Sequence, residues 1–156
     1  MRRRHWILLS CLVVAGLVLA SCGSAPQKRS LEVRITATTD INPDLQSRPS
    51  PVILHMLELS AIDEFNRASF FELTENDAAA LGGDLLNKTE IILTPGSSTQ
   101  RVLDLGERAA YLGFVVAYRD IDNARWRLSQ EVVPGETESI VVDVGSQQIS
   151  VTEVKN

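Results

Sequence analysis

Side chains capable of nucleophilic or metal chemistry are scarce in this sequence. It contains two histidines and two cysteines, and one of each, His5 and Cys11, lies in an apolar N-terminal stretch. Nucleophilic catalysis needs a base within hydrogen-bonding reach of the nucleophile, and a structural zinc site needs about four ligands. Beyond that stretch only His55 and Cys22 remain. His55 stands inside an apolar run, which is typical of a core position, so we expect neither an enzyme nor a metal site.

Acidic residues offer weaker candidates for chemistry. Asp120, Asp122 and Asn123 follow an apolar run, and oxygen ligands of this kind bind calcium, but the other ligands of a known loop are missing at this spacing. Asp and Asn are also common turn formers, which is the interpretation we favour. A sugar-stacking cleft around paired carboxylates is disfavoured by the aromatic content of only 5%.

The N-terminus has the pattern of an export signal. Arg2 to Arg4 precede an apolar run from Trp6 to Ala20, and this run is short for a permanent transmembrane anchor. The run ends in Leu-Ala-Ser-Cys at residues 19–22, which resembles the bacterial lipobox. We therefore predict that residues 1–21 are a lipoprotein signal peptide and that Cys22 becomes the mature N-terminus, carrying a diacylglycerol and an N-acyl chain. A simple secretory signal with a chance cysteine is the alternative.

Residues 22–30 are expected to form the acylated cysteine and a flexible tether. Gly23 to Ser30 are polar and aperiodic, and eight extended residues reach at most about 28 Å. Gly23 stands where inner-membrane lipoproteins usually carry aspartate, so resemblance to that sorting rule favours the outer membrane. Without the three leader arginines the chain has 12 basic and 20 acidic residues, a formal charge of −8. That charge does not suit nucleic acid.

The body of the chain alternates apolar and polar residues with a period of two, the pattern of strands with one buried face. A first such row runs from Leu31 to Ala37, while runs 52–59 and 111–118 are apolar at most positions and fit central strands covered on both faces. Turn residues separate the runs, which favours one antiparallel β-sandwich domain over residues 31–156. The expected strands are residues 31–37, 52–59, 90–94, 99–105, 111–118, 126–132, 140–144 and 149–151.

Helical signals occur only between the second and third strands. Ser60 with Asp63, and Thr74 with Asp77, match a helix-starting residue followed by an acid three residues later. We expect one or two short helices here. Three of the four phenylalanines lie in this insertion, at positions 65, 70 and 71, and we expect them to pack on the sheets as a lid.

The connection Asp40–Pro51 is long for a link between two strands and contains three prolines. Proline fixes φ and lowers the cost of ordering a loop on binding. Ile41 and Leu45 place apolar groups beside Asp44 and Arg48, a composition suited to recognising a protein surface. From composition alone, a structural crossover between sheets is an equal alternative.

Several segments in one order resemble the outer-membrane lipoprotein family of type VI secretion systems called TssJ or SciN. The likeness covers nearly all of Leu31 to Val151 together with the lipobox. The segments that carry it are Ile41–Asp44, Arg48–Val52, Phe65–Leu73, Leu81–Leu86, Leu93–Gly96, Tyr111–Asp120 and Trp126–Arg127.

The resemblance implies a transthyretin-like β-sandwich of about eight strands, acylated at Cys22 and held at the periplasmic face of the outer membrane without a catalytic role. In that family the lipoprotein binds the C-terminal periplasmic part of TssM, and with TssL the two proteins form a trans-envelope complex. The loop between the first two strands is the main contact, which corresponds here to Asp40–Pro51. As projecting side chains of this loop we nominate Asn42, Asp44, Leu45 and Arg48.

A carrier lipoprotein is the alternative function. In that interpretation the insertion from Phe65 to Phe71 gates an apolar pocket for a lipid or another small ligand.

Overall fold

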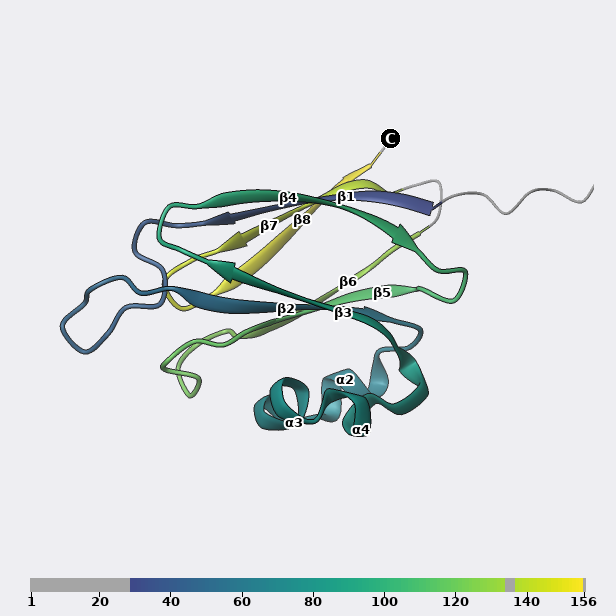
Figure 1. Cartoon of the computed structure of the whole chain (residues 1–156), viewed down its shortest axis with the longest axis horizontal. Helices are drawn as coiled ribbons and strands as arrows, with labels where there is room; N and C mark the ends of the chain where they lie inside the picture. The colour runs from purple at the N-terminus through teal and green to yellow at the C-terminus, as the bar shows by residue number, and fades with distance from the viewer. Residues whose placement is uncertain (1–28, 134–136, 156) are drawn as a thin grey trace, which may run out of the picture.

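The computed structural model describes residues 29–133 and 137–155, which form a sandwich of two four-stranded sheets (Figure 1). The first sheet has the order β4-β1-β7-β8 and the second β3-β2-β5-β6. The expected β-sandwich is confirmed. The strands are β1 (Arg29–Ala37), β2 (Val52–Leu59), β3 (Leu85–Leu93), β4 (Ser98–Leu105), β5 (Tyr111–Val116), β6 (Arg127–Glu131), β7 (Thr137–Val144) and β8 (Ile149–Lys155).

Strand β1 lies in the interior of the first sheet and follows the predicted alternation. Its odd-numbered residues from Leu31 to Ala37 are buried, and the residues between them face outward. It pairs antiparallel with β4 and parallel with β7, whereas the other strand pairs of both sheets are antiparallel. The parallel pairing of β1 with β7 is compatible with the long connection between these strands, because β2 to β6 lie between them in the chain.

The main core lies between the two sheets and is built from their inward-facing apolar residues, with Phe114 as its largest fully buried member. Burying such side chains is the dominant favourable contribution to folding. Other residues of this core are Val33, Ile35, Leu54, Leu93, Leu112, Ile140, Val142 and Val144.

Three short helices cover part of the outer face of the second sheet (Figure 1). They are α2 (Asp63–Arg67), α3 (Phe70–Glu75) and α4 (Asp77–Leu81), followed by a 3₁₀ turn, η1 (Gly82–Asp84). The Phe65 ring fills the space above Gly113 of β5, where a Cβ atom would lie 2.8 Å from Phe65 Cε2. Most of β2 and β5 is thus covered on both faces, as predicted, with Ile53 near the start of β2 left partly exposed, and Phe65 is packed into a second core.

The predicted helix starts are wrong in position. The capping box is formed by Ser69 and Glu72 at the start of α3. Ser60 instead donates a hydrogen bond to Asp84 Oδ1 at 2.9 Å, and Thr74 donates to the Phe70 carbonyl inside α3 at 2.9 Å. The serine and threonine hydroxyls therefore serve tertiary and helix-interior contacts that spacing alone does not distinguish from caps.

Strand β1 includes Arg29, whereas the sequence pattern predicted the first strand from residue 31. The Arg29 guanidinium donates hydrogen bonds of 3.0, 3.1 and 3.0 Å to the carbonyls of Gly106, Glu107 and Ala109. These bonds fasten the start of β1 to the loop after β4. The predicted signal peptide, the acylated Cys22 and most of the tether lie outside the described residues. Within the described part of the chain, no helix has the length and hydrophobicity needed to span a membrane.

Candidate functional site

The β1–β2 loop, residues 38–51, protrudes from one end of the sandwich (Figure 1). Two other connections meet it there: the segment after β5 and the turn between β7 and β8. The backbone N–H of Asn42 donates a hydrogen bond to the Ser146 carbonyl at 3.1 Å, and the backbone N–H of Thr38 donates one to the Val144 carbonyl at 3.0 Å. These contacts seat the base of the loop on the first sheet. We call this end of the molecule the loop end.

Asn42 holds the base of the loop from inside. Its side chain is buried, its Nδ2 donates to the Pro51 carbonyl, and its Oδ1 accepts from the Arg119 amide, both at 2.9 Å. Its φ of 47° lies in the left-handed region that Asn tolerates better than most residues. The expectation that Asn42 projects from the loop is therefore wrong, because its side chain is buried and hydrogen-bonds to backbone groups of Pro51 and Arg119. Ile41 is also fully buried.

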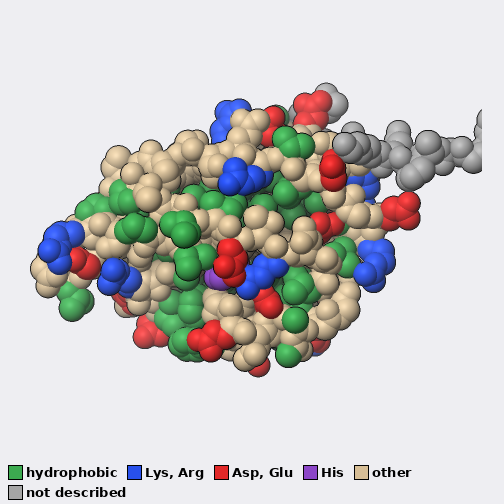
Figure 2. All heavy atoms as spheres, viewed as in Figure 1, with side chains coloured by type: hydrophobic (Ala, Val, Ile, Leu, Met, Phe, Trp, Pro, Cys, Tyr) green, Lys and Arg blue, Asp and Glu red, His purple; other side chains and the backbone are tan. Residues whose placement is uncertain are grey.

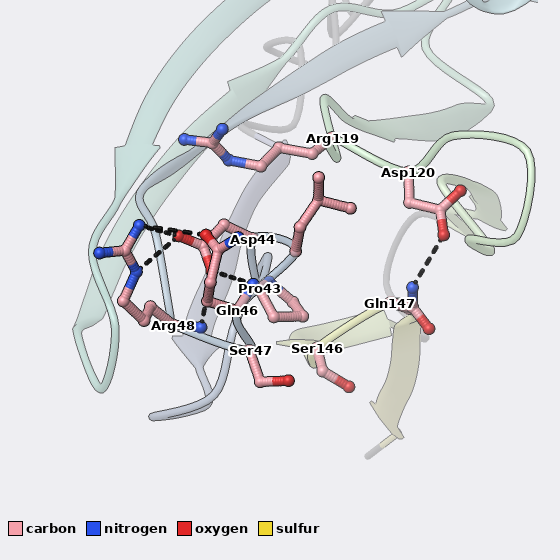
Figure 3. Close-up of a pocket in the computed structure, with 10 residues that line it drawn as sticks. Pro43, Asp44, Gln46, Ser47, Arg48, Arg119, Asp120, Ser146 and Gln147 are labelled. Atoms are coloured by element: carbon pink, nitrogen blue, oxygen red, sulfur yellow. Dashed lines mark hydrogen bonds and ion pairs between the residues drawn. The ribbon is translucent and has the colours of Figure 1, made fainter.

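Asp44 organises the tip of the loop. Its Oδ1 accepts hydrogen bonds from the backbone amides of Gln46 and Arg48, both at 2.9 Å. Its Oδ2 lies 2.8 Å from Arg48 Nε and 2.7 Å from Arg48 Nη2 (Figure 3). The backbone adds bonds from Ser47 N to Asp44 O and from Asp44 N to Arg48 O, and Ser47 has a φ of 59°. This is a tight turn closed by a residue in the left-handed region.

Leu45 stands at the apex of this turn with 99% of its side-chain surface exposed. Arg48 is also exposed, whereas Asp44 is partly buried by the turn that it closes. Of the four nominated side chains, Leu45 and Arg48 therefore project most freely. Two effects restrict the loop: the prolines fix its backbone torsions, and the side chains of Asn42 and Asp44 form hydrogen bonds to its backbone.

An open cleft of about 900 Å³ lies between the loop tip and the neighbouring connections (Figure 3). Its far wall contains Arg119 and Asp120, and Asp120 Oδ2 accepts a hydrogen bond from Gln147 Nε2 at 3.2 Å. Sequence reasoning missed Arg119 and Gln147, because only the fold brings these connections beside the loop. The other lining residues are Pro43, Asp44, Leu45, Gln46, Ser47, Arg48 and Ser146.

The sequence profile of the T6SS-SciN family, described as Type VI secretion lipoprotein (VasD, EvfM, TssJ), matches residues 29–147. The chain belongs to this family of type VI secretion lipoproteins. The resemblance inferred from the motifs is thereby confirmed. No curated protein matched the sequence.

Solved structures support the family assignment. The type VI secretion lipoprotein TssJ1 from Pseudomonas aeruginosa is 33% identical, with 81% of this chain and 97% of that chain covered and a TM-score of 0.79. Serratia marcescens Lip, a membrane-bound component of the type VI secretion system, is 22% identical, with 79% and 96% covered and a TM-score of 0.73. A chain in the structure described as "T6SS protein TssM C-terminal domain (869-1107) from EAEC" is 22% identical, with 78% and 99% covered and a TM-score of 0.66. The last two similarities concern the fold alone.

A type VI secretion lipoprotein is a structural component of the secretion system and not an enzyme, as the sequence predicted. His55 fits this role, because it is buried in β2, and burial lowers the pKa of its imidazole. Its Nδ1 lies 3.2 Å from Glu90 Oε1. Among the described residues, no group of three or more His, Cys, Asp or Glu side chains is placed to bind a metal ion.

We predict that Asn42→Ala lowers the free energy of unfolding by about 2 kcal/mol, because it leaves the partly buried Arg119 amide and Pro51 carbonyl without their protein partner and empties a buried side-chain site. Urea denaturation of the two proteins measures the difference. Asn42→Asp is the matched variant, since it keeps the acceptor for the Arg119 amide but replaces the donor to Pro51 by a carboxylate oxygen that repels the Pro51 carbonyl. A change below about 0.5 kcal/mol for the alanine variant would contradict the structural role of Asn42.

The loop tip is predicted to resist acid. The Arg48 backbone amide, followed by its guanidinium, holds the pKa of Asp44 below its ordinary value. A lowered carboxyl pKa in the folded state means that the stabilising contribution is complete above the ordinary Asp range and is lost as pH falls through the lowered pKa. We expect the NMR signals of Arg48 Nε and of the Gln46 amide to stay unchanged from pH 7 to about 4 and to shift only below it. A midpoint at or above the ordinary Asp value refutes this prediction.

Proposed function

We propose that this lipoprotein binds the periplasmic C-terminal part of TssM through the tip of its β1–β2 loop. Acyl chains on Cys22 hold it at the periplasmic face of the outer membrane, and with TssL and TssM it builds the trans-envelope complex. The observation that carries the proposal is Leu45, a large apolar side chain with 99% of its surface exposed at the apex of an ordered turn.

Order in the loop is what makes an exposed leucine useful for binding. A free loop loses conformational entropy when a partner fixes it, and that loss reduces affinity. Here the turn is already held by the bonds of Asp44 to the amides of Gln46 and Arg48, and its base by the bonds of Asn42. Leu45 is therefore presented at low entropic cost, like the aliphatic anchor of a preorganised interface.

The direction of β1 supports an orientation toward the periplasm. The tether enters the domain at Arg29, and the loop leaves β1 after Ala37 at the opposite end of the sandwich (Figure 1). Nine residues of extended strand span about 30 Å. If Cys22 is held in the outer membrane, the loop end is directed away from the tether's attachment point, toward a partner that reaches up from the inner membrane.

Cys22→Ser is predicted to abolish secretion without unfolding the domain. The variant loses the acyl chains. Each methylene group that such a chain buries in the membrane contributes about 0.8 kcal/mol to membrane binding. The sequence predicts that Cys22 belongs to the tether, so thermal unfolding of the domain is expected to stay at the wild-type temperature. The measurements are membrane fractionation and effector release from cells. Effector release at the wild-type level would show that anchoring is not required.

Partner binding is tested by titrating the protein with the periplasmic part of TssM. A replacement of the whole β1–β2 loop would remove Ile41 from the core and Asn42 from its buried bonds. The informative variant therefore changes only residues 45–47 to glycines. We expect an unchanged unfolding temperature and no detectable heat of binding, and wild-type affinity for this variant would refute the loop assignment.

The structure does not favour the carrier function. That function needs a space beneath the insertion, but the Phe65 ring is fully buried and occupies the position directly above Gly113. The cleft at the loop end is open and lined largely by polar side chains, whereas sites for lipids and similar ligands are enclosed and mostly apolar.

A further inference from the structure

The outer face of the second sheet carries two exposed isoleucines that the helices do not cover. Ile53 of β2 and Ile92 of β3 are direct neighbours in the strand register and are 39% and 73% exposed. The core beneath the helices contains Leu57, Leu59 and Val115 but neither isoleucine. Figure 1 shows that α2 to α4 lie under the part of this sheet that is farther from the β1–β2 loop. We call Ile53 and Ile92 the isoleucine shelf.

The outer face of the first sheet is polar along β1, although the same sheet exposes Val102 of β4 and Val154 of β8. The outward residues of β1 are Glu32, Arg34 and Thr36, which are polar and partly or fully exposed. A strand that faces water on one side is expected to alternate in this way. The second sheet instead places two exposed apolar residues, Ile53 and Ile92, directly opposite each other, whereas Val102 of the first sheet is paired with Glu32. Apolar side chains gather on this side of the molecule, between the loop and the helices (Figure 2).

The shelf is continuous with the loop end. Ile53 comes two residues after Pro51, whose carbonyl accepts the bond from Asn42 Nδ2, and the Ile53 carbonyl accepts the Ala117 amide at 2.9 Å. Ile92 precedes the β3–β4 turn, where the Gly96 amide donates to the Thr38 carbonyl at 3.1 Å. Both isoleucines therefore stand on strands that are hydrogen-bonded to the base of the β1–β2 loop or to the segment beside it.

We infer that the protein that binds the loop tip also covers the isoleucine shelf with an apolar part of its own surface. The inference rests on the proposed function and extends it, because it adds a sheet face to a contact otherwise confined to a loop. One exposed leucine buries little area, and stable interfaces need an apolar centre surrounded by further contacts. The shelf supplies such an extension on a rigid sheet, next to the loop that we assign to the same partner.

The test compares Ile92→Asp with Val102→Asp in the full-length acylated protein in nanodiscs. Val102 is a matched control, because it is also apolar, 64% exposed and on an edge strand, but it belongs to β4 of the first sheet. Binding to the periplasmic part of TssM is measured by interferometry. We expect Ile92→Asp to weaken binding at least tenfold and Val102→Asp less than twofold. Ile92→Thr, which keeps a β-branched side chain in the strand, is expected to weaken binding by a smaller factor at an unchanged unfolding temperature.

Each of the following outcomes would overturn the inference about the isoleucine shelf. Wild-type affinity of both Ile92 variants together with lost binding by Leu45→Asp overturns the shelf contact and leaves the proposed function intact. Absence of binding by the wild-type protein overturns both. Equal losses for Ile92→Asp and Val102→Asp show a general effect of added charge and overturn the inference. A dimer in sedimentation velocity that Ile92→Asp dissociates assigns the shelf to a second copy of this chain, which also overturns it.

Discussion

Replacing Leu45 by aspartate is expected to weaken binding to the periplasmic part of TssM by roughly thirtyfold or more, which corresponds to the ~2 kcal/mol that defines an interface hot spot. The leucine side chain is 99% exposed, so its contacts in the isolated protein are negligible. The variant removes the apolar anchor and forces a charge into the same position of the complex. Calorimetric titration of both proteins measures the change.

The stability of the Leu45 variant is the internal control. An exposed side chain at the apex of a turn contributes little to folding, so thermal unfolding is expected within experimental error of the wild type. Leu45→Met, which keeps volume and apolar character, is expected to retain most of the affinity. If the aspartate variant binds as tightly as the wild type, the loop tip is not the contact.

Phe65→Ala is expected to lower the free energy of unfolding by about 3–5 kcal/mol, the usual cost of emptying a fully buried aromatic site. The ring is fully buried between α2 and the second sheet, against Gly113 and Leu59. It also lies 5.8 Å from the Arg127 guanidinium, which donates hydrogen bonds of 2.8 Å to the Phe65 and Ala68 carbonyls. The truncation therefore loosens the helices from the sheet. Urea unfolding monitored by circular dichroism measures the loss.

Phe71→Ala is the matched control for this experiment. Phe71 lies in the same insertion, but its side chain is 58% exposed. Its ring packs edge-on against the ring of Phe70, at a centroid distance of 5.4 Å. We expect a loss of about 1 kcal/mol or less. Similar losses for the two variants would contradict a packed core beneath the helices.

The strands were predictable because a buried face imposes a period of two. In β1 every second residue from Leu31 to Ala37 is buried, and the apolar runs of β2 and β5 do form central strands that are covered on both faces over most of their length. Local spacing failed at the helices, where Ser60 and Ser69 look alike as candidate caps. Only Ser69 has its glutamate in a capping box, while Ser60 donates a hydrogen bond to Asp84 at the end of η1.

The sequence predicted which loop forms the candidate site, but not which side chains form the exposed surface around it. The length and the prolines of residues 40–51 pointed to a stiff connection, and Leu45 and Arg48 do project from it. Composition does not reveal that Asn42 turns inward, because its partner at Arg119 is distant in sequence. For the same reason Gln147 and the isoleucine shelf become visible only when the sheets are assembled.

Site-specific photo-crosslinking in cells tests the central claim most directly. A photoreactive amino acid is placed at position 45, at the loop tip, or at position 102, on the outer face of the first sheet. We predict a crosslinked product with TssM from position 45 and none from position 102. No product from position 45, or equal products from both positions, would contradict the assignment of the loop end as the surface that binds TssM.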